Sequence, residues 1–259
     1  MDEFGHFGSE VATGRVLADH ARRTPNSHIT GASGAPQVYA TKTRGATPVG
    51  GWHTSLCRLS FRKGELVSHK GAEGDPWHGR TVRVRLDATD ADRKPENAGA
   101  VSARIMKSSA RVEATVPELV QALSLGWSVL PGVCEGRRTP GCWESQELFM
   151  VDVDNDAAMA GRGWSPLGYD EAVERAFRYG LPLALGYRTF GSSPDPDAPA
   201  GEQRFRLGFL APRKVEDAGE ARRFAEGMRA AFPEADRSTS ELNRIFFGTD
   251  KEVDVWGRL

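Results

Sequence analysis

The chain has 259 residues, of which 27% are charged and 39% hydrophobic, and its formal net charge is −1. This composition is ordinary for a soluble globular protein, and the length suffices for one large domain or two small ones. No apolar run approaches the roughly 18 residues of a membrane span, the N-terminus lacks a secretory signal pattern, and three cysteines argue against a disulfide framework. We therefore expect a cytoplasmic protein with no membrane contact.

The first 110 residues contain only short sequence patterns typical of helices and strands. Residues 1–35 combine a short helical pattern with a turn-rich stretch, and we expect a weakly structured segment. Strand-like pieces follow at 36–42, 55–61 and 80–88. Residues 87–100 read as a polar loop, because they show no hydrophobic periodicity. We expect residues 36–110 to form a strand-rich or α/β module.

The periodicity is stronger after residue 110. The segment TVPELVQALSLG predicts a helix with Thr115 as its N-cap, proline and glutamate in its first turn, and Gly126 at its end. Further helices are expected at 169–180 and 215–232, and strands at 127–133, 146–154, 183–189, 203–211, 244–248 and 252–256. We expect residues 111–259 to form an α+β core with helices packed on one face of a sheet.

The segment FMVDVDND ends an apolar run with acidic side chains. Asp152 and Asp154 are two residues apart, so both would point to the same face of a strand. Two carboxylates on one face repel each other unless a cation neutralises them, and hard oxygen ligands of this kind select Mg²⁺ or Mn²⁺. The alternative interpretation is a solvated strand end, with Asp156 an ordinary loop residue.

Arginines in later segments supply groups that could handle phosphate. They are Arg204, Arg206 and Arg244. Two divalent ions can activate an attacking hydroxyl and stabilise a leaving pyrophosphate, and a guanidinium pairs with two phosphate oxygens at once. Carboxylates with arginines therefore indicate phosphoryl or nucleotidyl transfer. A solvent-facing position is the alternative for Arg204 and Arg206.

Four segments between about residues 98 and 250 resemble, in their order, the archaeo-eukaryotic primase (AEP) superfamily, most closely the primase-polymerase (prim-pol) domains of phages and plasmids of Gram-positive bacteria. They are TVPELVQALSLGWSVLPGVC, RRTPGCWESQELFMVDVDN, RFRLGFLAPRKVED and ADRSTSELNRIFFGT. The resemblance implies an α+β fold with an RRM-like catalytic sheet, helices packed on it and a smaller N-terminal α/β layer. It also implies a DNA primase or DNA-directed polymerase that uses two metal ions to join nucleoside triphosphates on single-stranded DNA.

The resemblance assigns roles to the first two motifs. Asp152 and Asp154 match the first motif, the metal-binding acids. The second motif usually carries a histidine that contacts the phosphates of the incoming nucleotide. This chain has RFR at that place, so Arg206, flanked by Arg204, would have to take the role of the histidine.

The third acid and the remaining cations follow from the same resemblance. Asp236 comes after the long helix, as the third motif requires; Asp250 is the other candidate, and a turn-capping role is the alternative for Asp236. Arg244 is expected to meet a phosphate or the template. Arg137 and Arg138, in the loop before the D-x-D strand, could hold template DNA or form an exposed basic loop.

Cys134 and Cys142 invite a zinc interpretation because some members of the family carry such a site. The spacing C-x7-C is not that of common zinc sites, and zinc would need His53 and Cys57 to be brought close by the fold. We therefore expect reduced, partly buried thiols and no zinc.

Three functions remain open. The first is a primase or primase-polymerase that serves DNA replication of a phage or plasmid, with salt-sensitive template binding and, by analogy, a replicative helicase as partner. The second is a catalytically degenerate replication-initiation or nucleic-acid-binding module. The third is a D-x-D glycosyltransferase that binds a sugar nucleotide through Mn²⁺, which would leave RFR and R-x-F-F-G without a role.

Overall fold

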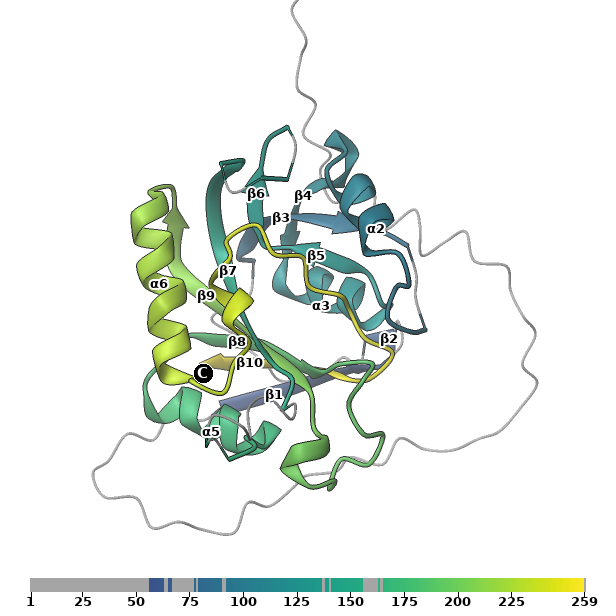
Figure 1. Cartoon of the computed structure of the whole chain (residues 1–259), viewed down its shortest axis with the longest axis vertical. Helices are drawn as coiled ribbons and strands as arrows, with labels where there is room; N and C mark the ends of the chain where they lie inside the picture. The colour runs from purple at the N-terminus through teal and green to yellow at the C-terminus, as the bar shows by residue number, and fades with distance from the viewer. Residues whose placement is uncertain are drawn as a thin grey trace, which may run out of the picture.

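A computed structural model describes residues 56–62, 65–66, 77, 79–89, 92–136, 138–139, 141–155, 163 and 165–258 (Figure 1). The patterns predicted within residues 1–42 lie outside these residues. The described part has a mixed α+β fold with two antiparallel sheets. This class agrees with the sequence prediction, whereas the RRM-like description of the sheet stays a prediction.

The larger sheet, as far as the chain is described, has seven strands in the order β2-β1-β10-β8-β9-β7-β6. Their bounds are β1 (Leu56–Arg62), β2 (Glu65–Leu66), β6 (Gly132–Cys134), β7 (Trp143–Val153), β8 (Leu183–Arg188), β9 (Phe205–Val215) and β10 (Val253–Arg258). The long strands β7 and β9 lie side by side, and their apolar residues are buried because both faces of the sheet are covered.

A smaller sheet and helix α3 (Val116–Ser124) cover one face of the larger sheet. In the described residues this sheet has the order β4-β3-β5, with bounds β3 (Thr81–Asp87), β4 (Arg111–Thr115) and β5 (Ser128–Leu130). Helix α3 begins at Thr115, which forms the predicted capping box with Glu118. Its buried residues Leu119 and Leu123 join the core between the sheets.

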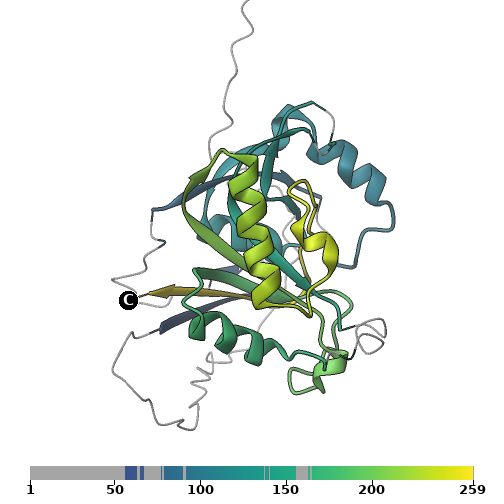
Figure 2. The ribbon, with the colours of Figure 1, turned by 60° about the vertical axis from the view of Figure 1, so that its left-hand side comes forward.

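Two helices cover the opposite face of the larger sheet, as Figure 2 shows. They are α5 (Tyr169–Arg178) and α6 (Ala218–Ala231). Ala172 and Ala176 from α5 and Met228 from α6 pack on alternate residues of the central strands. Small side chains on these helices allow them to approach the sheet closely, and α6 begins at Asp217, which accepts a hydrogen bond from the Glu220 amide.

The strand predicted at 127–133 is two strands in two different sheets. β5 joins the smaller sheet and β6 the larger one, and Pro131 lies between them. Proline has no amide hydrogen to donate to a ladder, so the chain can leave one sheet there and enter the other. Periodicity alone does not distinguish this from a single strand.

The sequence prediction lacks several elements of the structure, among them strand β2. Helix α2 (Ala98–Ile105) begins inside the segment predicted as a polar loop; Asn97 caps it, and Val101 and Ile105, four residues apart, are buried. Strand β4 also escaped prediction. Conversely, residues 244–248 are not a strand, because among the described residues they form only a single bridge, between Phe246 and Val129.

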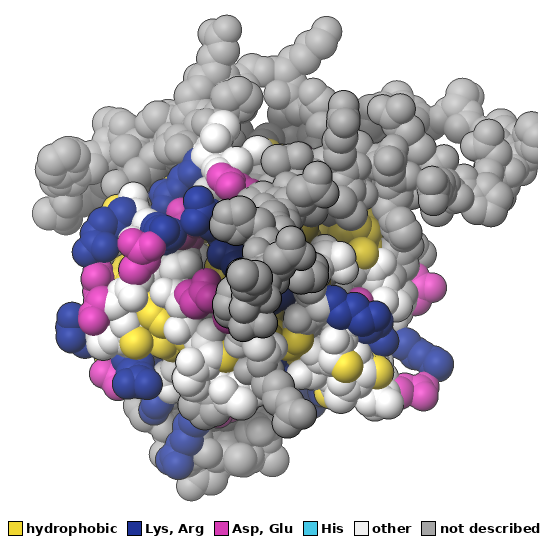
Figure 3. Space-filling model, turned by 90° about the horizontal axis from the view of Figure 1, so that it is seen from above, with side chains coloured by type: hydrophobic (Ala, Val, Ile, Leu, Met, Phe, Trp, Pro, Cys, Tyr) yellow, Lys and Arg dark blue, Asp and Glu magenta, His cyan; other side chains and the backbone are white. Residues whose placement is uncertain are grey.

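The predicted boundary at residue 110 stays a prediction, and each sheet draws strands from both sides of it: β1 pairs with β10, and β3 pairs with β4 and β5. No helix in the described ranges is both long and apolar enough to cross a membrane. In the view of Figure 3, Lys and Arg side chains lie beside Asp and Glu side chains, which agrees with the nearly balanced net charge.

Candidate metal centre

The end of β7 places Asp152 on the face of the sheet that carries the smaller sheet and α3. Val151 and Val153 join the core under α5 and α6, and Met150 joins the core between the sheets. Because side chains alternate along a strand, Asp152 points to the same side as Met150. Its side chain is 1% exposed.

Asp236 reaches this point because a short 3-10 helix, η3 (Arg237–Ser240), docks on the edge of β7. The Asp236 amide donates to the Asp152 carbonyl at 2.8 Å, and the Asp152 amide donates to Thr239 Oγ1 at 3.3 Å. Asp236 also caps η3, since its side chain accepts from the Ser238 amide at 3.0 Å. The turn-capping role and the meeting with Asp152 therefore occur together.

The three predicted acids meet in one cluster. Each of Asp152, Asp154 and Asp236 offers a carboxylate oxygen, and these oxygens lie within 4.8 Å of one another. Asp152 is buried and the other two are partly buried. Asp250, the other candidate for the third acid, is exposed and is not part of this group.

The cluster has an uneven charge balance. Burial, then the neighbouring Asp152 charge, raises the pKa of Asp154. Burial alone would also raise the pKa of Asp236, but hydrogen bonds from Ser238 and the Arg244 charge together hold it below its usual value. A bound cation relieves the repulsion between close carboxylates. Of the three acids, Asp154 is therefore the one whose ionised form a cation would stabilise most.

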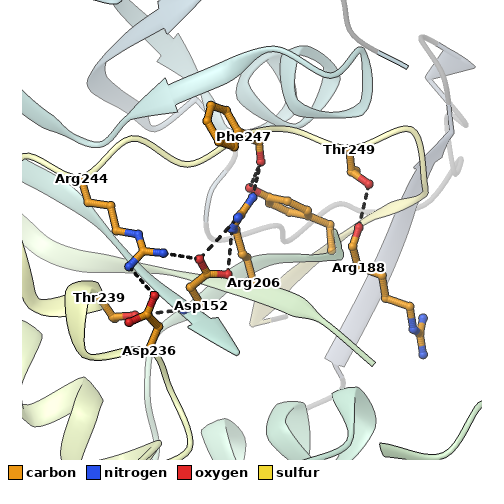
Figure 4. A network of polar contacts seen from close by, with 9 residues as sticks. Asp152, Arg188, Arg206, Asp236, Thr239, Arg244, Phe247 and Thr249 are labelled. Atoms are coloured by element: carbon orange, nitrogen blue, oxygen red, sulfur yellow. Dashed lines mark hydrogen bonds and ion pairs between the residues drawn. The ribbon is translucent and has the colours of Figure 1, made fainter. Parts of the chain in front are cut away.

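Two arginines already contact Asp152 (Figure 4). Arg206 stands directly opposite it on β9, and its Nε donates to Asp152 Oδ1 at 3.0 Å. Arg244 donates from Nη2 to Asp152 Oδ2 at 2.6 Å and from Nη1 to Asp236 Oδ2 at 3.0 Å. Both oxygens of the buried carboxylate are therefore paired, as burial of a charge requires.

Arg206 is fixed on several sides. Its Nη1 donates to the Phe247 carbonyl at 2.6 Å, and its guanidinium lies 5.9 Å from the Tyr187 ring centre and 5.8 Å from that of Phe246. Burial would lower the pKa of Arg206, but the Asp152 charge and the interactions with Tyr187 together outweigh burial and raise this pKa. Arg206 is therefore a permanent cation that orients Asp152.

Among the described residues, Arg204 and Arg138 make no hydrogen bond to the three acids, and both are exposed. Arg204 directly precedes β9, and its charge acts to lower the pKa of Asp154. Its guanidinium lies against Gly191. Arg138 is exposed and donates to Ser102 Oγ and to the Asn243 carbonyl, each at 3.0 Å. Arg137 and Asp156 lie outside the described residues.

The expectation of reduced thiols at Cys134 and Cys142 was wrong. Their sulfurs are paired as a disulfide beside the start of the β6–β7 ladder, and both residues are buried. The prediction relied on the odd number of cysteines. Three cysteines can still form one disulfide, with Cys57 as the third cysteine. His53 and the Cys57 side chain, the other residues of the zinc interpretation, lie outside the described part.

Sequence reasoning missed Thr239, Tyr187 and Phe247 as parts of the site. Thr239 and the Phe247 carbonyl act through hydrogen bonds to Asp152 and Arg206. The Tyr187 hydroxyl donates to the same Phe247 carbonyl at 2.9 Å. A tyrosine within an apolar strand such as LALGYR was the available signal, since a buried hydroxyl usually has a partner.

Comparison with known proteins adds little to this geometry. No protein-family model and no curated protein matches the chain. One solved structure that matches is the AEP domain of the cyanophage S-2L primase-polymerase (PrimPol), at 11% identity over 69% of this chain and 81% of that one, with a TM-score of 0.31. A TM-score of this size does not establish a common fold, and the case for the site rests on its own contacts.

Proposed function

We propose that the chain is a nucleotidyltransferase of the primase-polymerase type, which makes primers on single-stranded DNA from nucleoside triphosphates. The observation that carries the proposal is the meeting of Asp152, Asp154 and Asp236 within 4.8 Å. The order of the motifs in the sequence, from the D-x-D strand to RFR and R-x-F-F-G, supports the same function. Its setting would be the cytoplasm, in replication of a phage or plasmid with a replicative helicase.

The donor set of the cluster fits a divalent cation. Three carboxylates provide only hard oxygen ligands, which select Mg²⁺ or Mn²⁺, and the raised pKa of Asp154 reflects burial and repulsion that a cation would offset. Asp152, Asp154 and Asp236 would hold the two ions of this chemistry. Such ions, when bound, activate an attacking hydroxyl and stabilise a leaving pyrophosphate.

The arginines divide into two groups by their contacts. Arg206 orients Asp152 and is held there by the Phe247 carbonyl. Arg204, which is exposed, and Arg244, which is partly exposed, are better placed to meet a triphosphate, because a guanidinium fork matches phosphate oxygens. Arg137 and Arg138 remain the proposed template contacts, since backbone phosphates dominate binding of single strands.

One observation favours a second candidate, a nucleic-acid-binding module without chemistry. Both oxygens of Asp152 are already paired with Arg206 and Arg244, so the buried carboxylate needs no cation for neutralisation. A degenerate relative that has replaced its metal with arginines would show this pattern. The two candidates differ in whether the protein synthesises primers.

The test is incubation of the protein with single-stranded DNA, labelled nucleoside triphosphates and Mn²⁺, followed by sizing of the products. Asp154→Asn is the informative variant, because Asp154 lacks the buried arginine pairs of Asp152, and we expect it to lower synthesis by more than about 100-fold. Asp250→Asn, which changes an exposed acid outside the cluster, should synthesise as well as the wild type. Template binding by wild type and Asp154→Asn alike, with no synthesis by either, would instead support the binding module.

A further inference from the structure

Arg244 bridges two of the three carboxylates that a cation would share. Its Nη2 lies 2.6 Å from Asp152 Oδ2, and its Nη1 lies 3.0 Å from Asp236 Oδ2. In Figure 4 the guanidinium points directly between the two acids. A divalent cation bound by both carboxylates competes for the same oxygens.

We infer that Arg244 is a built-in competitor of the cation. The guanidinium holds the acids together in the metal-free protein, and a cation binds by displacing it. The inference rests on the proposed function, because it assumes that the three acids hold a divalent ion. It adds that an internal side chain sets the affinity of the site for that ion.

Arg244, and not Arg206, is the side chain that can leave. Among the described residues, the Arg244 side chain makes its polar contacts with Asp152 and Asp236, the prospective ligands, and its guanidinium lies 5.4 Å from the centre of the Phe246 ring. Arg206 also donates to the Phe247 carbonyl, which is not a prospective ligand, so its departure would in addition break a partly buried hydrogen bond, at a cost of about 1 kcal/mol.

The position of Arg244 in the chain also allows the displacement. It belongs to the segment between η3 and β10, which has no helix or strand, and its side chain is 18% exposed against 10% for Arg206. The displaced guanidinium can therefore reach water without opening the core. Arg206 remains against Asp152 and keeps that carboxylate oriented.

Charge balance gives the sign of the effect. Removing the positive charge of Arg244 adds one unit of net negative charge to the cluster. It also frees Asp236 Oδ2 from this guanidinium and leaves Asp152 Oδ2 with the longer contact from Arg206 Nη2, at 3.3 Å. Both changes favour a cation, because close charges attract strongly in a partly buried site. A variant without the Arg244 guanidinium therefore binds metal more tightly than the wild type does.

The test is calorimetric titration of the protein with Mn²⁺ in the absence of nucleotide and DNA. Arg244→Gln should lower the dissociation constant about tenfold, which corresponds to about 1.4 kcal/mol. Arg244→Lys should give an intermediate value, because an ammonium is a point charge that does not form the two-pronged bridge. Thermal unfolding without metal shows whether each variant is folded. If Arg244→Gln does not fold, the Mn²⁺ affinity of Arg244→Lys still tests the inference.

Arg237→Gln is the matched control. It makes the same change of side chain and charge on an exposed residue next to Asp236, and it should change the Mn²⁺ affinity much less than Arg244→Gln does. An equal gain in both variants would mean that general electrostatics, and not occupancy of the oxygens, controls affinity, and the inference would be overturned. Unchanged or weaker binding by Arg244→Gln would overturn it as well.

A further variant, Asp154→Asn, distinguishes failure of the inference from failure of the proposed function. Asp154→Asn should lose most of the Mn²⁺ binding seen in the wild type. If it binds Mn²⁺ as the wild type does, the ion is not at the cluster, and both proposals are wrong. If Asp154→Asn loses binding while Arg244→Gln gains none, the metal site stands and only the competitor is excluded.

Discussion

Asp152 lies near the end of β7 and Asp154 lies one residue beyond this end, and the two acids differ in the contacts that hold them. Asp152 is buried and paired with Arg206 and Arg244, whereas Asp154 is partly buried and its pKa is raised by burial and by Asp152. A buried carboxylate with ion-pair partners contributes to the stability of the fold, whereas a carboxylate repelled by its neighbours does not. Loss of the Asp152 charge should therefore mainly lower stability, whereas loss of the Asp154 charge should mainly weaken metal binding.

Substitution of each acid by asparagine should show this separation. Asp152→Asn leaves the buried Arg206 cation without its charge partner, and removal of one member of a buried pair costs about 3 kcal/mol or more. Asp154→Asn removes a repelled charge, so stability should be unchanged or slightly higher. Urea unfolding of both variants checks the prediction, and equal losses of stability would contradict it.

Tyr187 gives a prediction about pH. Burial raises the pKa of its hydroxyl to about 12, above the value near 10 of an unfolded chain. The folded state thus keeps this proton longer, so the stability that it contributes is complete below about pH 10 and is lost as the pH rises toward about 12.

Tyr187→Phe should remove this loss. Near neutral pH the variant loses the hydrogen bond to the Phe247 carbonyl, at a cost of about 1 kcal/mol. At about pH 11 the difference in free energy of unfolding between the wild type and Tyr187→Phe, measured in urea, should be smaller. The wild type loses stability at this pH as the phenol ionises, and the variant has no phenol. Tyr179→Phe, at an exposed position, is the control, and a deficit that is constant with pH in Tyr187→Phe would refute the explanation.

Sequence periodicity predicted part of this site. The period of two along a strand placed Asp152 and Asp154 on one face, and the resemblance of motif order selected Asp236. The pairing of Asp152 with Arg206 depends on the register between β7 and β9, which a single sequence does not specify. The bridge by Arg244 depends on a segment without secondary structure, whose path follows from tertiary contacts alone.

At the scale of elements, the segment RIFFG shows why an apolar run is not always a strand. It first runs beside β5, where the Phe246 amide and carbonyl pair with Val129. It then passes the end of α3, where the Thr249 amide donates to the Leu123 carbonyl at 2.9 Å. A Cβ on Gly248 would lie 2.5 Å from the Leu123 and Trp127 carbonyl oxygens. The glycine of the motif is therefore required for close approach of two backbones.

Gly248→Ala should destabilise the protein by about 2 kcal/mol or more, because backbone atoms cannot move aside as a flexible side chain does. Gly227→Ala is the matched comparison, since a Cβ there meets nothing within 4 Å and alanine favours a helix interior such as that of α6 by up to about 1 kcal/mol. Urea unfolding should give opposite signs for the two variants. A mild effect at Gly248 would show that the segment is not docked on α3.

The disulfide between Cys134 and Cys142 ties β6 to β7 beside Arg85, whose guanidinium donates to the Cys134 carbonyl. Reduction should lower the free energy of unfolding by about 2–3 kcal/mol, because the cross-link limits the unfolded chain. The measurement is urea unfolding with and without a dithiol reductant. The Cys134→Ala/Cys142→Ala double variant should not respond to reductant, and an equal response in both proteins would place the effect elsewhere.

At the scale of the molecule, the sequence predicted most elements after residue 115 but not their arrangement. Capping at Thr115, glycine at the end of α5 and the apolar run of β7 are local signals that a single chain carries. The sheet order is set by contacts between distant segments, such as β1 with β10. The same is true of the passage from β5 to β6 between two sheets, which looks locally like one strand.

The candidate metal centre depends on this long-range arrangement, so metal binding should stabilise the whole fold. Asp152 and Asp154 come from the end of β7 and Asp236 from the start of η3, and the unfolded chain does not bring them together. An ion that binds only the folded state adds about 2.7 kcal/mol at 100 times its dissociation constant, and Mn²⁺ should raise the urea midpoint until the site is saturated. Asp154→Asn should respond much less, because it lacks one ligand. An equal rise in wild type and variant would mean that Mn²⁺ acts at other surface acids, and the three aspartates would then be only a structural cluster, in which Arg244 joins Asp152 to Asp236.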